Sequence, residues 1–172
     1  DTLRRYQPEY LQKGENRLAY RLSLRVGQLR LVTTSAFFVL VLVFWEPIAP
    51  LFKIEDYRDE FLLFGVLILS HFQCQVLMMS LSAHLLQKYS VGWTAGFSII
   101  KAVGYALAMW IWGLDLWTVF AVDVVAYGVF WAGLKYAYLF KANHEKGSAA
   151  SFDSQESKRL VRYATYHSFN DA

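Results

Sequence analysis

The sequence has little charge and a single cysteine, and each shortage excludes a class of protein. Charged residues make up 18% and hydrophobic residues 56% of the 172 residues, whereas soluble domains have about 25% and roughly 45–50%. The formal net charge is +3, but a disordered or nucleic-acid-binding tail is poor in apolar side chains, so this class is excluded. The lone Cys74 excludes an internal disulfide framework and a zinc site built on several cysteines.

Motifs for catalysis and for cofactor binding are also lacking. The sequence contains no GxxxxGK[ST] phosphate loop, no GxGxxG dinucleotide fingerprint and no HExxH zinc motif. Ser82 and His84 are close in sequence, as are His71 and Cys74, but neither pair has a third group at a useful spacing to orient it. We therefore expect no enzymatic activity, no metal site and no cofactor.

Long apolar segments are what the chain has instead. A spanning helix needs about 20 mostly apolar residues to cross a hydrocarbon core of about 30 Å. Tryptophans near the ends of these segments suit the headgroup level, where amphipathic rings collect. The sequence predicts an all-α, polytopic membrane protein with four transmembrane helices. Their expected ranges are 31–50, 61–83, 89–113 and 116–134.

The distribution of basic residues predicts which way these helices point. Residues 1–30 contain seven Arg and Lys, whereas residues 53–60 contain two bases against four acids. The link at 84–88 contains Lys88 and no acid, the turn at 113–115 contains no base, and six bases follow residue 134. Loops rich in Lys and Arg stay on the cytoplasmic side. Both ends of the chain and the 84–88 link are therefore expected to be cytoplasmic.

The segments outside the bilayer have distinct compositions. Residues 1–30 are expected to form a cytoplasmic basic loop and a juxtamembrane helix, with a break at Gly14 and a helix from residue 15 into the first span. Residues 135–157 are expected to be a cytoplasmic linker, because they become small and polar. Residues 158–172 are expected to begin a further helix.

A basic stripe marks the juxtamembrane helix. Arg17, Arg21 and Arg25 recur every four residues and so lie on one helix face. Each basic residue near an anionic membrane surface is worth about 1 kcal/mol. The stripe either anchors the chain at the headgroups or binds a lipid pyrophosphate or a partner.

Two charged residues fall inside the predicted spans, Lys101 in the third and Asp123 in the fourth. A charge at the bilayer centre costs at least about 2.5–3.5 kcal/mol on insertion scales, so such residues are candidates for function. Three uses remain open. Lys101 and Asp123 form a structural ion pair, or Lys101 holds an anionic group in a water-filled cavity, or Asp123 couples transport to an ion or proton.

Polar and small residues within the spans predict helix contacts. Gln73 and Gln75 point about 200° apart on a helix, so we expect them, like His71, to form hydrogen bonds between helices rather than to face one cavity. Small side chains let helix backbones approach closely. The residues expected to form such close-packing faces are Gly92, Gly96, Gly104, Gly128 and Ala132.

The N-terminal segment resembles a known family. Arg5-Tyr6-Gln7-Pro8-Glu9, followed by Gly14 and an Arg/Leu-rich run into a membrane helix, is similar to polysaccharide and lipid-linked oligosaccharide flippases of the multidrug/oligosaccharidyl-lipid/polysaccharide exporter superfamily. In that family such a stretch closes the cytoplasmic loop after the second helix. Residues 158–163 likewise resemble the lead-in to the seventh helix. The resemblance implies that residues 31–134 are helices three to six, part of an N-terminal bundle.

The resemblance also implies a function and a location. Such flippases carry a polyprenyl-pyrophosphate-linked glycan across the bacterial cytoplasmic (inner) membrane by alternating access, as one bundle rocks against another. The candidate substrate-binding residues would then be Lys101, Arg21 and Arg25, and Asp123 would be the candidate for ion coupling. The expected partners are membrane lipid, the lipid-linked glycan and other envelope polysaccharide proteins, with no nucleic acid.

Two other functions remain open from the sequence. One is a structural or interaction subunit of an envelope polysaccharide assembly. The other is a membrane enzyme that acts on a lipid-linked substrate, which would need an acid/base pair or a metal cluster at the interface that the sequence does not show.

Overall fold

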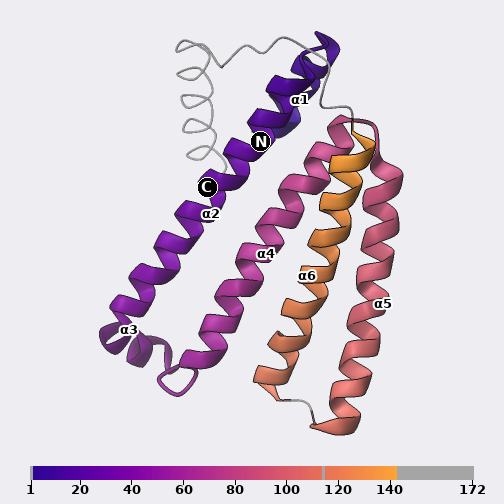
Figure 1. Ribbon diagram of the computed structural model, residues 1–172. Coiled ribbons are helices and arrows are strands. Elements are labelled where there is room, and N and C mark those ends of the chain that lie inside the picture. The colour runs from indigo at the N-terminus through magenta and orange to yellow at the C-terminus, as the bar shows by residue number, and fades with distance from the viewer. Residues whose placement is uncertain (1, 114, 143–172) are drawn as a thin grey trace.

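The computed structural model describes residues 2–113 and 115–142, and within them all regular structure is helical (Figure 1). Residues 143–157 of the predicted linker and the further helix predicted at 158–172 lie outside the described residues. Helices α2, α4, α5 and α6 are each long and apolar enough to cross a membrane, which confirms an all-α fold with four candidate spans. In order, the helices are α1 (Thr2–Gln12), α2 (Asn16–Val43), α3 (Trp45–Phe52), α4 (Arg58–Ala83), α5 (Gln87–Ile111) and α6 (Leu116–Lys141).

Residues 2–12 form a helix, α1, and the predicted basic loop is wrong there. Its apolar side chains Leu3, Tyr6 and Tyr10 recur at helical spacing and are buried against α2 and α4. The chain reverses at Gly14, whose φ of 76° is accessible to a residue without a side chain. From Asn16 the helix α2 then runs through the juxtamembrane segment into the span, as predicted.

The predicted first span, 31–50, is wrong at its C-terminal end. Helix α2 ends at Val43, and α3 begins at Trp45. Pro47 explains the break, because its nitrogen has no hydrogen to donate to the Val43 carbonyl and its ring crowds that carbonyl. Proline is tolerated in the first turn of a helix, and Pro47 occupies that position in α3.

The other spans lie within a few residues of their predicted ranges, except at the end of α6. This helix continues to Lys141, so residues 135–141 are helical rather than part of a linker. Ala137 and Tyr138 lie in this extension and are buried in the cluster where α4, α5 and α6 meet. Burial of this additional apolar surface stabilises the helix beyond its most hydrophobic segment.

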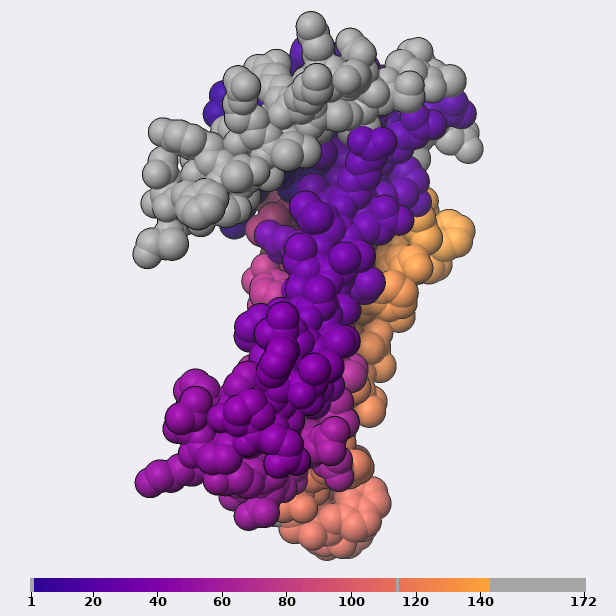
Figure 2. Space-filling view, turned by 90° about the vertical axis from the view of Figure 1, so that its left-hand side faces the viewer, coloured from indigo at the N-terminus to yellow at the C-terminus, as the bar shows by residue number. Residues whose placement is uncertain are grey.

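Helix α4 lies at the centre of the bundle. It packs against α6, α2, α1 and α5, and α6 also packs against α5. Helix α2 lies at one edge of the bundle (Figure 1), faces the viewer in Figure 2, and contacts α1, α3 and α4. Large apolar side chains remain exposed along α2, including Val32, Phe37 and Val39. Such surface is compatible with lipid contact, because lipid tails are as apolar as these side chains.

Only some of the glycines predicted to form close-packing faces lie against a neighbouring helix. A Cβ built on Gly104 would lie 2.7 Å from Val122, which confirms close packing of α5 on α6. Among the described residues, a Cβ on Gly92, Gly96 or Gly128 would meet no atom within 4 Å, so these predicted packing faces are wrong. The reason is helical phase. Trp93 on α5 faces α6, and Gly92 precedes it by one residue, about 100° around the helix.

Candidate functional site

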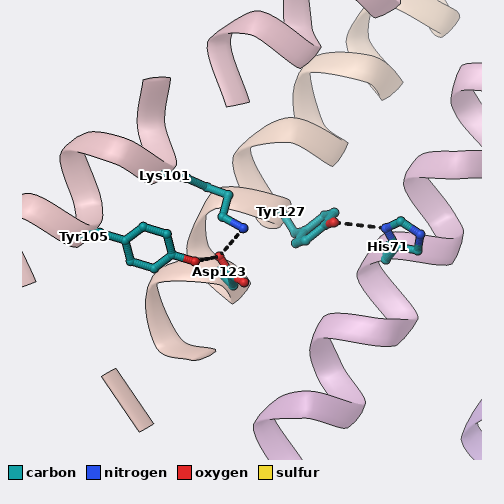
Figure 3. Close-up of polar contacts among 5 residues, drawn as sticks. All are labelled: His71, Lys101, Tyr105, Asp123 and Tyr127. Atoms are coloured by element: carbon teal, nitrogen blue, oxygen red, sulfur yellow. Dashed lines mark hydrogen bonds and ion pairs between the residues drawn. The ribbon is translucent and has the colours of Figure 1, made fainter. Parts of the chain in front are cut away.

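Lys101 on α5 and Asp123 on α6 form an ion pair between two candidate spans. The Lys101 Nζ lies 2.7 Å from the Asp123 Oδ1. The hydroxyl of Tyr105 donates a hydrogen bond to the same oxygen (Figure 3). Lys101 and Tyr105 are four residues apart, so both project from one face of α5. Two donors on one carboxylate offset much of the cost of holding it in the membrane.

The ion pair is partly accessible. The side chains of Lys101 and Asp123 are 27% and 15% exposed. The ammonium also lies 5.4 Å from the ring centroid of Phe97 and 5.5 Å from that of Tyr105, within the range of cation–π attraction. The structure thus shows the pairing that one of the three predicted uses requires, and it keeps one side of the pair open to other groups.

A second polar cluster lies beside the first, on α4 and α6. The His71 Nδ1 lies 3.0 Å from the Tyr127 hydroxyl oxygen, and the His71 Nε2 lies 2.9 Å from the Gln75 Nε2. Tyr127 follows Asp123 by one turn of α6, so the two clusters adjoin (Figure 3). Together they connect α4, α5 and α6 near the middle of the spans.

The side-chain amide of Gln75 joins Arg30 to His71. The Arg30 Nη1 donates to the Gln75 Oε1 at 3.4 Å, and the Gln75 Nε2 faces the Nε2 of His71 at 2.9 Å. Arg30 of α2 is thereby connected through Gln75 and His71 of α4 to Tyr127 of α6.

Gln73 and Gln75 point in different directions, as predicted. The Gln73 Nε2 donates to the carbonyl oxygen of Gly27 at 3.0 Å and so ties α4 to α2. Gln75 accepts from Arg30 of α2 and also contacts His71 on its own helix. The predicted hydrogen bonds between helices are confirmed.

Tyr138 connects three helices at the end of the bundle where α1 lies. Its hydroxyl is 3.0 Å from the Ser23 Oγ of α2 and accepts a hydrogen bond from the Gln7 Nε2 of α1 at 3.4 Å. Gln7 and Ser23 are buried. Because buried polar groups are costly without partners, these contacts help to hold α1 and α2 against α6.

The family-motif residues lie in α1 and in the turn that follows it. Tyr6 is buried against α2 and α4, and the Arg5 guanidinium lies 5.6 Å from the Tyr6 ring centroid. Glu9 forms an ion pair with the lysine one turn later, at 2.9 Å. Pro8 lines a groove between α1 and α4. The described contacts of these residues pack α1 on the bundle, and Gly14 makes the turn into α2.

Arg21 and Arg25 are not brought together with Lys101. Both are exposed on α2, and α2 does not contact α5 in the part of the chain that the structure describes. The predicted substrate-binding residues thus divide into Arg21 and Arg25 on the surface of α2 and Lys101 inside the bundle. Arg30, five residues after Arg25, is the arginine that reaches the polar network, through Gln75.

Sequence reasoning missed several members of this network. Pairs of polar residues four apart on one helix were a signal that could have found them, because such residues share a helix face. The pairs are His71 with Gln75, Lys101 with Tyr105, and Asp123 with Tyr127.

Neither similarity to known proteins nor a metal-ligand geometry assigns a function to the site. Comparing the chain with protein-family models, curated proteins and solved structures gives no match. Within residues 2–113 and 115–142, no group of three or more His, Cys, Asp or Glu side chains is placed to hold a metal ion. The site is therefore interpreted from the chemistry of its own side chains.

Proposed function

We propose that the chain is part of a flippase that moves a lipid-linked oligosaccharide or exopolysaccharide precursor across the bacterial inner membrane by alternating access. The observation that carries the proposal is a row of polar and ionisable side chains through the bundle. Each charge in the membrane interior costs at least about 2.5–3.5 kcal/mol on insertion scales, and such residues mark substrate or ion pathways. The row consists of Arg30, Gln75, His71, Tyr127, Asp123, Lys101 and Tyr105.

The row extends along the direction in which a lipid headgroup would move. Gln75 is eight residues from Ala83 at the end of α4, and Asp123 is eight residues from Asp115, the N-cap of α6. At 1.5 Å per residue, each lies about 12 Å from its helix end. These two helix ends are on opposite sides of the bundle (Figure 1). The row therefore offers a headgroup successive polar contacts across the central part of the membrane.

The charge distribution supports the proposed orientation of the chain in the membrane. The segments at the α1 end of the bundle are rich in Arg and Lys, which favours a cytoplasmic location for both ends of the chain. The pyrophosphate of a polyprenyl-pyrophosphate-linked glycan is anionic. The positive charges of Arg30 and Lys101 in the row complement it. Lys101 is then the candidate for contact with the substrate, and Asp123 for ion coupling.

Deletion of the gene in its native host, complemented with full-length variants, tests the proposal. Without the protein, lipid-linked glycan should remain in the inner leaflet, measured as accessibility to an added glycosidase in inverted but not right-side-out vesicles. The double variant Lys101→Met/Asp123→Leu removes both charges together and leaves no unpaired charge in the membrane. This variant should accumulate normally, and its export of lipid-linked glycan should fall at least about tenfold. Normal outer-leaflet glycan in the deletion strain would contradict the proposal.

A structural subunit of an envelope polysaccharide assembly is the second candidate. The pairing of Lys101 with Asp123 favours it, since an ion pair that is satisfied within the bundle needs no substrate. In that case the double variant should keep both its abundance and glycan export. A matched control is Lys88→Ala on the exposed end of α5, where the ammonium contacts the ring of Tyr89.

A further inference from the structure

Arg30 lies where α2 meets α4 and has few contacts for a guanidinium. Its Nη1 donates to the Gln75 Oε1 at 3.4 Å, and its Cζ lies 5.8 Å from the ring centroid of Phe72. Within the described part of the chain it forms no ion pair with a carboxylate. A guanidinium carries five N–H donors, so most of those on Arg30 remain available to an anion.

Neighbouring side chains hold Arg30 in place. Gln75 cannot turn its amide over without losing the hydrogen bond from Arg30 and placing its NH2 group against the guanidinium, donor against donor. The Gln75 oxygen therefore keeps facing Arg30, and the Phe72 ring supports the guanidinium from another direction. A charged donor that is oriented before its ligand arrives loses less entropy on binding.

Arg30 contacts one lining residue of each of two grooves. One has a volume of about 540 Å³ between α1 and α4 and is lined by Arg4, Gln75, Met79 and Ser82. The other, of about 370 Å³ between α2 and α4, is lined by Thr34, Phe37, Phe64 and Phe72. Gln75 belongs to the first groove and Phe72 to the second. Arg30 contacts both residues.

The two grooves share one face of α4. The α4 residues that line them are spaced by three or four positions, which places them in a single stripe. Along α4, from the groove that Phe72 lines to the groove that Gln75 lines, these residues are Phe64, Ile68, Phe72, Gln75, Met79 and Ser82. The face is therefore apolar and aromatic on one side of Arg30 and more polar on the other.

We propose that this face of α2 and α4 binds an anionic phospholipid of the bilayer, with its phosphate on Arg30. The acyl chain lies in the phenylalanine-lined groove, and the headgroup lies in the groove beside Gln75 and Ser82. Gln75 is eight residues from Ala83, about 12 Å along the helix, and a long arginine side chain reaches toward the headgroup level from such a depth. The lipid belongs to the leaflet at the α4–α5 link.

Charge complementarity selects the class of lipid. No acidic residue lines either groove in the described part of the chain. A choline or ethanolamine headgroup would thus bring its positive charge beside Arg4 and Arg30 without a carboxylate to receive it. A glycerol headgroup is uncharged and can bond to the Ser82 hydroxyl and the Gln75 amide. Phosphatidylglycerol fits these conditions.

Photolabelling of the purified full-length protein tests the site. The probe is phosphatidylglycerol with a diazirine in one acyl chain, present at a few per cent in phosphatidylcholine vesicles. Peptide mass spectrometry should locate the adducts at residues 33–38 and 64–72. Unlabelled phosphatidylglycerol should reduce labelling at least about fivefold more than the same amount of added phosphatidylcholine. Equal competition by the two lipids, or adducts spread over all four spans, would overturn the proposal.

Three variants separate this site from general surface charge. Arg30→Gln should lower specific labelling about tenfold, whereas Arg25→Gln, at an exposed arginine of the same helix, should leave it within about twofold. Gln75→Glu supplies Arg30 with an internal carboxylate, so it should also abolish labelling while α2 and α4 stay tied together. Retained labelling in Gln75→Glu, or equal losses in the two arginine variants, would show that Arg30 is not the phosphate ligand.

Discussion

Lys101 of α5 and Asp123 of α6 are joined by an ion pair, with the Nζ 2.7 Å from the Oδ1. The two helices are consecutive and joined by a short link, so the pair closes a helical hairpin in the membrane. The hydroxyl of Tyr105 donates to the same carboxylate. The Asp123 carboxylate of α6 is tolerated here because Lys101 and Tyr105 both reach it from α5.

Removal of one member of this pair should cost more stability than removal of both. Lys101→Ala or Asp123→Ala leaves a lone charge in the membrane, and each should lower the free energy of unfolding by about 2 kcal/mol, less than for a fully buried pair because the site is partly exposed. Lys101→Ala/Asp123→Ala should recover part of that loss. Thermal unfolding of the purified protein in detergent measures all three. A double variant as unstable as the sum of the single changes would show that the two charges are not coupled.

Tyr138→Phe should weaken the attachment of α1 and α2 to α6. The change removes the hydroxyl that contacts Ser23 and Gln7 and leaves these buried groups without that partner. We expect a loss of about 1–2 kcal/mol in the free energy of unfolding. Tyr136→Phe is the matched control, since Tyr136 lies on the same helix with its side chain exposed. Equal effects of the two substitutions would contradict the assignment.

Gly133→Ala should separate α5 from α6. A Cβ on Gly133 would clash with the indole ring of Trp93, so the indole or one of the helices must shift. Overpacking of this kind costs typically about 1–3 kcal/mol. Gly128→Ala on the same helix adds a methyl group that meets no described atom within 4 Å and should be neutral or slightly stabilising. The melting temperatures of the two variants test this difference, and a Gly133→Ala protein as stable as Gly128→Ala would refute it.

Asp115 should titrate below its ordinary range. It caps the N-terminus of α6 outside the apolar segment, and hydrogen bonds from Thr118 lower the pKa of its carboxyl below the ordinary value of 3.8. A lowered pKa means that the capping contribution is present above the unfolded-state value and is lost as the pH falls through the folded-state value. Carbon-13 NMR of the Asp115 carboxyl measures the shift. Thr118→Val removes the hydroxyl and should raise the pKa part of the way, whereas an unshifted pKa in the unmodified protein would exclude the cap.

Cysteine labelling should reveal the orientation. The buried Cys74 is first replaced by alanine. Single cysteines are then introduced at two exposed positions, Lys13 just before α2 and Asp56 between α3 and α4. A membrane-impermeant maleimide, added to intact cells at the outer face of the membrane, should label position 56 and not position 13. Position 13 should react only after the cells are lysed. The reverse pattern would mean that the basic ends are not cytoplasmic.

The sequence by itself determined the number of candidate spans and most of their ends. Crossing a bilayer requires a long apolar segment, and such segments are local properties that can be counted along the chain. Local chemistry also placed the turn at Gly14, whereas the first span, predicted to continue to residue 50, ends at Val43. The helix α1 was missed because its burial depends on the surfaces of α2 and α4.

Only the tertiary structure decided which polar side chains meet. His71 and Tyr127 are 56 positions apart in sequence, and Arg30 and Gln75 are 45 apart. Helical periodicity gives the direction of each side chain around its own axis but not the rotation of one helix against another. That rotation is set by packing, such as Gly104 against Val122 and Gly133 against Trp93. For this reason the spans could be predicted from local hydrophobicity, whereas the polar network and the face that carries Arg30 required the packed bundle.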